Sequence, residues 1–270
     1  IRWRVYTNDS ANQLNATDIF SYNTTTSNTA PTITFVYPPS AADPVEDGAR
    51  AFVINFTAND ADGTDDLHNA TMNVTSSGET PRVNSSCDLL GAASGNSQNY
   101  TCTVRLYYFD VNAAWTINAT INDSAGSEAS NSSQTLTFNL LTAMKMEPTA
   151  LTWPALTITS TNVGSNADPI TINNTGNDVI TNITVAAIDL AGETTSTEYI
   201  YAANFSVSVV DASNDSALMV NGSASGSQIA TANLTRNNHT VGSTAQEELY
   251  FYLEALNADL SSQSYSSADL

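Results

Sequence analysis

Apolar and polar residues alternate one by one through most of this 270-residue chain, and the apolar spacing of helices is nearly absent. Side chains of a β-strand point alternately to its two faces, so the pattern predicts strands with one buried and one solvated face. Clusters of Gly, Asn, Asp, Ser and Pro separate the alternating runs. We expect strands at 32–37, 51–58, 71–75, 100–107, 114–121, 135–141, 156–159, 169–173, 179–188, 204–210, 228–235 and 248–254. The chain is therefore predicted to be all-β.

A short internal repeat sets the domain boundaries. The run Trp3–Val5, followed by Asn8–Ala11, recurs as Trp115–Ile117 followed by Asn122–Ala125. The two occurrences are 112 to 114 residues apart, which is the size of one immunoglobulin-like β-sandwich. The chain is therefore expected to begin inside such a unit. We predict tandem immunoglobulin-like sandwiches: an incomplete N-terminal strand segment (partial sandwich or donor strand) at 1–30, a complete sandwich at 31–142 and a second one at 143–270.

Charge and composition exclude several classes of partner. The chain has 7 Lys and Arg against 27 Asp and Glu, a net charge of −20, which disfavours nucleic acid and anionic membrane surfaces. Asn, Ser and Thr, together 97 residues, take the place of charged residues, while 41% hydrophobic residues exclude a disordered chain. No apolar run reaches the roughly 18 residues that cross a bilayer, so no membrane insertion is expected. Because the first residue is Ile1, we expect a processed product or a piece of a longer protein.

Acceptors for N-glycosylation, Asn-x-Ser/Thr, give the strongest functional signal. With 67 Ser and Thr in 270 residues, 30 asparagines would give roughly seven or eight acceptors by chance. The chain has eighteen: Asn8, Asn15, Asn23, Asn55, Asn69, Asn73, Asn84, Asn99, Asn118, Asn122, Asn131, Asn173, Asn182, Asn204, Asn214, Asn221, Asn233 and Asn238.

The middle residues of these acceptors indicate how the strands would face. In several acceptors the middle residue is a large apolar one, which on a strand turns it inward and the Asn and Ser or Thr outward: Phe56, Val74, Tyr100, Ile183, Phe205 and Leu234. The alternative is that alternating strands rich in Asn and Thr produce the motif without modification. We expect most of the acceptors to carry covalent N-glycans, which implies an extracellular chain.

The two cysteines agree with that compartment. Cys87 and Cys102 form an even pair in a chain predicted to be secreted, so we expect a disulfide. A zinc site is not expected, because neither cysteine has a second Cys or a His at ligand spacing.

Several short runs resemble a known group of proteins. Ala30–Ile33, the acidic loop Asn59–Leu67, Tyr100–Tyr108 and Trp115–Gly126 resemble the immunoglobulin-like repeats of large, secreted archaeal cell-surface proteins. The run 169–177 is similar to the opening of another sandwich module in such proteins. The resemblance implies tandem sandwiches at a cell surface. The chain departs from it in ending soon after Tyr265, where one more closing strand is expected.

Catalytic patterns are not found, and we interpret the chain as non-enzymatic. His68 and His239 stand apart and are expected to be solvated loop residues, so neither suggests a nucleophile–histidine pair. The aromatic residues Tyr107, Tyr108, Phe109 and Trp115 allow a carbohydrate-binding platform or core packing, and we favour a core Trp115 against the disulfide.

One acidic loop has the composition of a cation site. Asp60, Asp62 and Asp66 surround Gly63, and alternate carboxylates with a turn-forming Gly suit Ca²⁺, which takes six to eight oxygen ligands. The bidentate Glu of an EF-hand is missing, so an ordinary Asp/Gly turn is the alternative. Calcium is therefore the one inorganic cofactor that the sequence suggests.

These observations lead to two functional hypotheses. The first is a structural extracellular glycoprotein, a subunit of a cell-surface filament or surface layer, with copies of itself as partners. Trp3 and Val5 would carry the assembly, because the N-terminal segment of one copy could complete a sandwich of the next by strand exchange. A fragment of a longer protein would explain that segment equally. The second hypothesis is a surface adhesin that binds glycans of a host or neighbouring cell.

Overall fold

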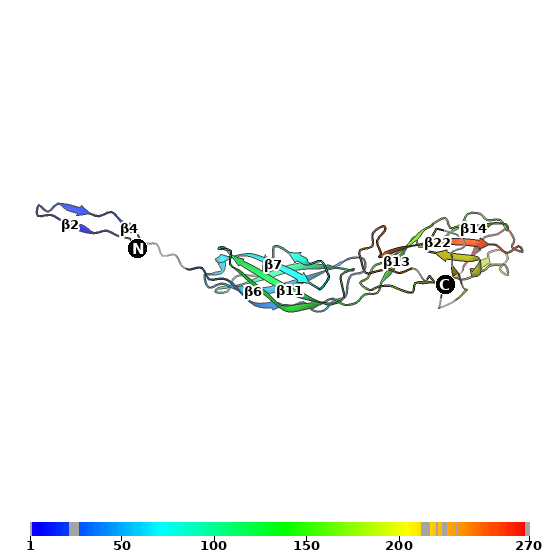
Figure 1. The fold of residues 1–270 in the computed structure, drawn as a ribbon, viewed down its shortest axis with the longest axis horizontal. Coiled ribbons are helices and arrows are strands. Elements are labelled where there is room, and N and C mark those ends of the chain that lie inside the picture. Colours follow the sequence, from blue (N-terminus) through cyan, green and yellow to red (C-terminus); the bar gives the residue numbers. More distant parts are fainter. Residues whose placement is uncertain are drawn as a thin grey trace.

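The computed structural model describes residues 2–21, 27–211, 217–219, 221–222, 226–229 and 232–267. These residues contain β-strands and two short 3-10 segments, η1 (Thr64–Asp66) and η2 (Ala202–Asn204), and no α-helix. The predicted all-β class is confirmed. Within the described ranges, no helix has the length and apolarity needed to span a membrane. Figure 1 shows the units following one another along the long axis.

The N-terminal segment is a β-hairpin. It consists of β1 (Arg2–Trp3), β2 (Tyr6–Asn8), β3 (Leu14–Ala16) and β4 (Phe20–Ser21). Strand β1 pairs with β4 and β2 pairs with β3, both antiparallel, and Trp3 lies opposite Phe20.

The next unit is a sandwich of two four-stranded antiparallel sheets. One sheet has the order β5 (Thr32–Tyr37), β6 (Ala49–Asn59), β10 (Ser97–Tyr107) and β9 (Asp88–Leu89). The other has the order β12 (Glu128–Thr137), β11 (Ala114–Asp123), β7 (Leu67–Thr75) and β8 (Arg82–Asn84). We call this unit the first sandwich.

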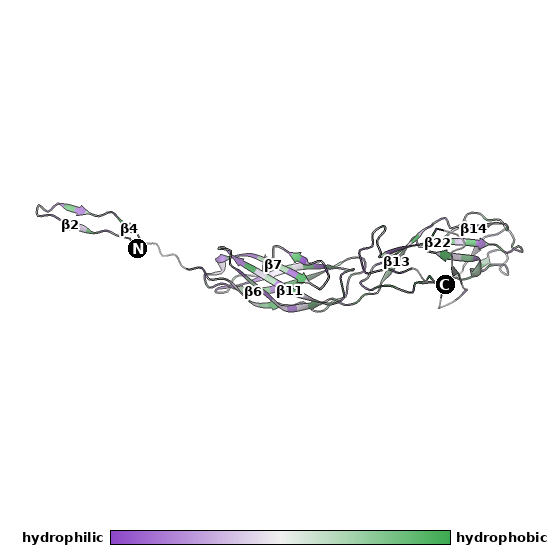
Figure 2. Ribbon diagram, in the orientation of Figure 1, coloured by the Kyte–Doolittle hydropathy of each residue, from purple (hydrophilic) through white to green (hydrophobic). Residues whose placement is uncertain are grey.

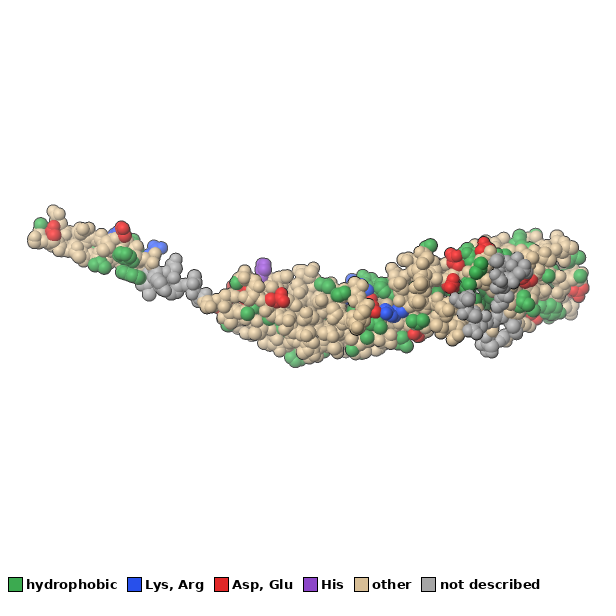
Figure 3. All heavy atoms as spheres, viewed as in Figure 1, with side chains coloured by type: hydrophobic (Ala, Val, Ile, Leu, Met, Phe, Trp, Pro, Cys, Tyr) green, Lys and Arg blue, Asp and Glu red, His purple; other side chains and the backbone are tan. Residues whose placement is uncertain are grey.

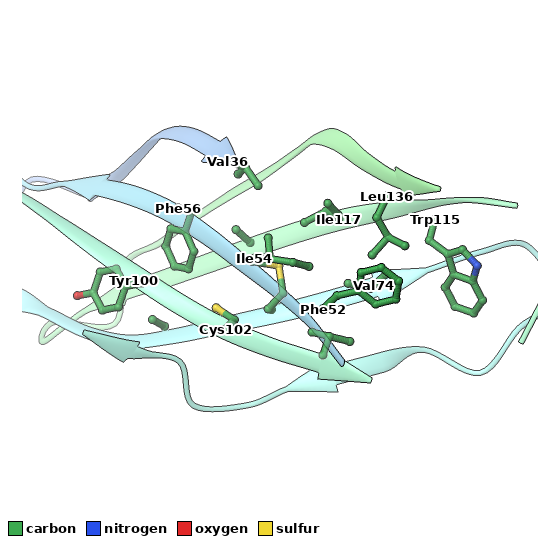
Figure 4. Close-up of a cluster of buried hydrophobic side chains, with 14 of the residues drawn as sticks. Val36, Phe52, Ile54, Phe56, Val74, Tyr100, Cys102, Trp115, Ile117 and Leu136 are labelled. Atoms are coloured by element: carbon green, nitrogen blue, oxygen red, sulfur yellow. The ribbon is translucent and has the colours of Figure 1, made fainter. Parts of the chain in front are cut away.

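Alternation along the strands builds the core of the first sandwich. In β6 every second side chain is buried, and the same holds along β11, whose buried apolar members are Trp115, Ile117, Ala119 and Ile121. Figure 2 shows hydrophobic and hydrophilic residues alternating along these strands. The buried side chains of both sheets meet between them (Figure 4), where Phe56 and Tyr100 stack with ring centroids 5.1 Å apart.

The disulfide is confirmed, and one prediction about it is corrected. Cys87 and Cys102 are bonded, which indicates an oxidising compartment. Trp115 is fully buried, as expected of a core residue, and its indole donates to the Val111 carbonyl at 3.0 Å. It does not pack against the disulfide: Figure 4 places Trp115 at the end of the core away from Cys102. The reason is that Trp115 is the second residue of β11, close to the end of the sandwich at which β10 finishes, whereas Cys102 lies in the middle of β10.

The C-terminal unit, which we call the second sandwich, has shorter strands. Its main sheet has the order β13 (Met144–Glu147), β15 (Ile170–Asn174), β22 (Gln246–Ala255), β19 (Phe205–Ser208) and β20 (Ala217–Leu218), with β14 (Thr161–Gly164) also on β22. Two small sheets are β16 (Thr184–Val185) with β21 (Ser227–Gln228), and β17 (Leu190–Gly192) between β18 (Tyr199–Ile200) and β23 (Tyr265–Ser266). A second buried cluster lies here, with Ile170, Phe251 and Leu253 among its members.

Two strand predictions near the middle of the chain differ from the structure. Residues 156–159 form no strand; Thr157 and Ser160 bond to each other in a turn, because their hydroxyl groups compete with strand pairing. The strand predicted at 135–141 is the end of β12, which begins at Glu128. Tyr265 itself lies in a strand, β23, which pairs with β17. The boundaries 31–142 and 143–270 stay predictions, and the two buried clusters fall on either side of residue 142.

Candidate functional site

The acceptor asparagines are spread over both sandwiches and the hairpin. Eight of them are exposed: Asn8, Asn15, Asn69, Asn99, Asn182, Asn221, Asn233 and Asn238. Seven are half-buried: Asn55, Asn73, Asn84, Asn118, Asn122, Asn131 and Asn204. Asn23 and Asn214 lie outside the described residues. The six apolar middle residues named above are all buried. The motifs at Asn55, Asn73 and Asn99 lie in strands and straddle their two faces as expected. The motif at Asn204 does not, because its Ser206 is also fully buried.

One acceptor is in the wrong place for a glycan. Asn173 is only 7% exposed, because β15 lies between β13 and β22 and the Gln246 amide donates to Asn173 Oδ1 at 2.8 Å. Thr175 of the same motif is fully buried, and its hydroxyl donates to Glu46 at 2.9 Å. A glycan at Asn173 would have to break this bond and open the packing around the buried side chain, so the folded chain offers no room for it.

The acidic loop brings its three predicted residues together. One carboxylate oxygen from each of Asp60, Asp62 and Asp66 lies within 4.8 Å of the others. The Asp62 amide donates to Asp60 Oδ1 at 2.8 Å, which closes the turn, and Gly63 has the positive φ of 111° that the turn requires. The Ser124 hydroxyl from the β11–β12 turn donates to Asp66.

The segment that enters the first sandwich is bonded to this loop and to the turn beside it. The Thr29 amide donates to Asp62 Oδ2 at 2.6 Å. The Asn28 side chain donates to Asp123 Oδ2 at 2.7 Å and to Ser127 Oγ at 3.0 Å. The Asn28 hydrogen bond is the main reason that the pKa of Asp123 is lowered. This end of the sandwich therefore gathers a cluster of carboxylates close to residues 28 and 29.

The N-terminal hairpin repeats a turn of the first sandwich. Asp9 N donates to Gln13 O and Gln13 N donates to Asp9 Oδ1; Asp123 and Ser127 make the same two bonds. The repeat found in the sequence is thus a repeat of local structure. Apolar side chains of the hairpin are open to solvent, including Trp3 at 50% and Val5 at 53%, whereas their counterparts Trp115 and Ile117 are fully buried.

The two sandwiches are joined by side-chain bonds, which we call the junction. Arg236 lies between them, donating from Nη2 to Glu79 Oε1 at 2.7 Å and from Nη1 to the Phe109 carbonyl at 2.6 Å. His239 Nε2 lies 2.6 Å from Asp47 Oδ1, so the prediction of a solvated His239 is wrong. Tyr108, which was expected to belong to a core or a platform, donates its hydroxyl to Asn238 at 3.1 Å.

The other side of the junction uses buried amides. Asn177 accepts from the Leu141 amide at 2.7 Å and donates to the Asn139 carbonyl at 2.9 Å. A Cβ on Gly176 would lie 2.1 Å from the Leu141 carbonyl oxygen, so only glycine permits this approach. Sequence reasoning missed the junction, although the polar run 173–177 with its glycine marked the place.

The surface aromatics near the junction pack on one another beside an open hollow. The Tyr107 ring stacks on Phe109 at 5.4 Å, and the Arg82 guanidinium lies 4.7 Å from the Tyr107 ring centroid. Arg82 is itself paired with the buried Asp110. A hollow of about 510 Å³ opens here, lined by Asp47, Gly48, Ala49, Arg82, Tyr107, Tyr108, Phe109, Asn238 and His239.

Comparisons with known proteins add little to this geometry. No protein-family model matches the chain, and no curated protein matches it. Among solved structures it has a likeness to the secreted serine protease VesC from Vibrio cholerae, with 13% identity and a TM-score of 0.22, over 84% of this chain and 49% of the protease. The chain thus spans about half the length of that protein, and a likeness this weak carries no argument. The interpretation of the chain as non-enzymatic stays a prediction.

Proposed function

We propose that this chain belongs to a structural extracellular glycoprotein, a subunit of a cell-surface filament or surface layer of the archaeal type that its sequence resembles. The observation that carries the proposal is the junction. Arg236, Asn177 and His239 tie two consecutive sandwiches, immunoglobulin-like in our proposal, into one elongated body. A subunit that fixes the spacing within a filament or surface layer needs its domains held in one relative position. Domains joined by a free hinge would not keep that spacing constant.

The acceptor asparagines support the extracellular location. Exposed acceptors occur on the hairpin and on both sandwiches, so glycans would cover the whole length of the body. Figure 3 shows that uncharged polar side chains and backbone dominate the face in view, with few cations. Glycans on such a surface would supply the hydration that charged side chains usually supply.

Intact-mass measurement of protein from its native source tests the glycosylation. We expect a mass well above the 28.5 kDa of the polypeptide, with attachment mapped to exposed acceptors such as Asn99 and not to Asn173. A mass equal to that of the polypeptide would contradict the proposal, and a glycan on Asn173 would contradict the placement of β15.

Copies of the chain are the proposed partners, with the hairpin as the connecting element. Trp3, which stacks on Phe20 with centroids 6.3 Å apart, and Val5 expose apolar surface that a sandwich would normally cover. A hairpin of one copy that completes the sheets of the next makes a head-to-tail contact, and such contacts propagate into filaments.

Negative-stain imaging of shed or reconstituted material tests the assembly. We expect regular polymers from the unchanged chain, and loss of polymer when residues 1–10 are deleted or when Trp3 and Val5 are replaced by Ser. The control is Arg4→Ala, an exposed neighbour in the same hairpin, which should leave the polymers intact. Undiminished polymers after the deletion, with the first sandwich folded in all variants, would rule out hairpin exchange.

A surface adhesin is the second candidate, and the hollow beside Tyr107 favours it. Aromatic rings next to a guanidinium can stack on and hydrogen-bond to a sugar. An adhesin would be imaged as isolated stalks and would bind glycans on an array, with binding lost in Tyr107→Ala. Glycan binding without polymers would replace the first proposal with this one.

A further inference from the structure

The acidic loop after β6 contains a charge that the chain itself leaves unbalanced. Three aspartates are buried in the first sandwich, Asp60, Asp110 and Asp123. Asp110 is paired with Arg82 and accepts the Tyr107 amide at 2.8 Å. Asp123 accepts from Asn28 and from the Ser127 amide. These two carboxylates therefore have partners on both oxygens.

Asp60 differs from them. It is 0% exposed, and although Oδ1 accepts the Asp62 amide, Oδ2 is buried and has no hydrogen-bond partner. Burying a carboxylate oxygen without a donor is unfavourable, and buried carboxylates in folded proteins are normally paired or bound to a metal. The carboxylates of Asp62 and Asp66 each bring an oxygen within 4.8 Å of one of Asp60, which adds negative charge rather than compensating it. Within the part of the chain that the structure describes, no Lys, Arg or His forms an ion pair with these three carboxylates.

We propose that Asp60, Asp62 and Asp66 bind a calcium ion, with Asp60 Oδ2 as the buried ligand. The donors are carboxylate oxygens, which suit a hard cation and not zinc or copper. An open hollow of about 380 Å³ lined by Asn28, Asp62, Asp65 and Asp66 leaves room for the further oxygen ligands and waters that calcium takes. Magnesium demands a near-ideal octahedron, which an irregular loop on one side of an open hollow suits less well.

The ion would act on the segment that leads into the first sandwich. Thr29 N is bonded to Asp62 Oδ2. Asn28 is bonded to Asp123, which directly precedes Ser124, the residue whose hydroxyl is bonded to Asp66 of the loop. Neutralising the loop would remove the repulsion that otherwise loosens these bonds. Calcium would therefore hold residues 28–30 against the sandwich and fix the direction from which the chain enters β5.

Calorimetric titration of the full chain with Ca²⁺ alone, after treatment with a chelator, tests the proposal. We expect one bound ion per chain and a higher Tm of the first sandwich with calcium than with chelator. Asp60→Asn and Asp66→Asn should each weaken binding by about tenfold or more, because each removes a charged ligand. Asp62 is changed to Ala, since Asn at that position would create a new glycan acceptor before Gly63 and Thr64.

The matched control is Asp88→Asn, which removes the same charge from an exposed strand, β9, of the same sandwich. It should leave calcium affinity unchanged. In chelator Asp60→Asn should be at least as stable as the unchanged chain, because it removes the unbalanced buried charge; this measurement also shows that the variant is folded. No calcium binding, equal binding by Asp60→Asn, an equal loss in Asp88→Asn, or equal affinity for Mg²⁺ would each overturn the calcium assignment.

Discussion

The two sandwiches of this chain are held together in different ways. The first has five strands of nine to eleven residues, β6, β7, β10, β11 and β12, and the inner faces of the first four are almost wholly apolar. Among the described residues of the second, only β22 is of that length, and the other strands are two to five residues long. Buried polar residues take part in its interior instead: Asn173, Asn174, Thr175, Asn177, Ser206 and Ser208.

The difference shows two routes to a stable β-unit. Long alternating strands make a ladder in which the hydrophobic effect acts on every second residue and no single residue is indispensable for the topology. Short strands leave backbone N–H and C=O groups without a partner in the sheet, and side chains must hydrogen-bond to them. Those bonds depend on particular residues. Substitutions should therefore act by volume in the first sandwich and by lost hydrogen bonds in the second.

The largest effect is expected from Trp115→Ala in the first sandwich. Its side chain is fully buried, so the cavity should lower the free energy of unfolding by about 3–5 kcal/mol. Scanning calorimetry combined with hydrogen exchange should show that the first sandwich is affected and the second is not. Val53→Ala, on the outer face of β6 and 57% exposed, is the control and should change stability by less than about 0.5 kcal/mol. Equal losses in both sandwiches would mean that they unfold as one unit.

Removing the disulfide is expected to give the second largest loss of stability. Cys87 and Cys102 close a loop of 15 residues, and replacing both by Ala should cost about 3 kcal/mol in the chain-entropy model. Denaturant unfolding with and without reductant measures the effect on the unchanged chain, and the double variant should no longer respond to reductant. A reductant effect on the second sandwich, which has no cysteine, would show that the two units are energetically coupled.

Asn174→Ala probes the polar interior of the second sandwich. Its fully buried amide donates to the carbonyls of Asp178 at 2.6 Å and Thr235 at 3.0 Å and accepts the Gly176 amide at 3.0 Å. Leaving these groups unpaired should cost about 1–3 kcal/mol, measured as the unfolding of the second sandwich. The exposed Asn166→Ala serves as the control. If both variants behave alike, buried amides do not hold this unit.

The smallest effect concerns the pH response of the second sandwich. The Glu198 carboxylate accepts from the Ser261 amide and hydroxyl, from Tyr265 and from Gln263, which lower its pKa from 4.5 to about 2. Because folding favours the ionised carboxylate, these hydrogen bonds stabilise the folded state above about pH 4.5, and this stabilisation is lost as the pH falls towards 2.

Glu198→Gln should remove that part of the acid response, and Glu193→Gln, an exposed neighbour, should keep it. Following the unfolding of the second sandwich in denaturant between pH 5 and about pH 2 distinguishes the variants. Identical acid profiles for the unchanged chain and Glu198→Gln would show that the four hydrogen bonds do not form in solution.

The sequence predicts the strands of the first sandwich better than those of the second. The strand expected at 32–37 is β5 residue for residue, and the expected 51–58, 100–107 and 114–121 lie inside β6, β10 and β11. Regular alternation is a local signal, so local inspection finds it. The polar strand β12, with its run of Ser and Asn at 130–133, was found only at its apolar end, because an edge strand need not alternate.

The junction and most of the second sandwich could not be found in this way. His239 and Asp47 are 192 residues apart, and nothing in either loop indicates the other. Asn174 is the middle residue of the acceptor motif at Asn173, and the sequence alone does not distinguish a buried asparagine from an exposed one. By contrast, the acidic loop was predicted correctly as a cluster because its three carboxylates lie within seven consecutive residues, 60–66.

The disulfide also bears on how such a body responds to tension. When a chain is pulled from its two ends, each domain that unfolds increases the end-to-end length by the length of its extended chain. The segment 87–102 is bypassed by the sulfur–sulfur bond, so its 15-residue separation is withheld from that extension, about 50 Å of chain. In an oxidising environment the first sandwich would lengthen less on rupture than its size suggests, and a reductant would release the difference.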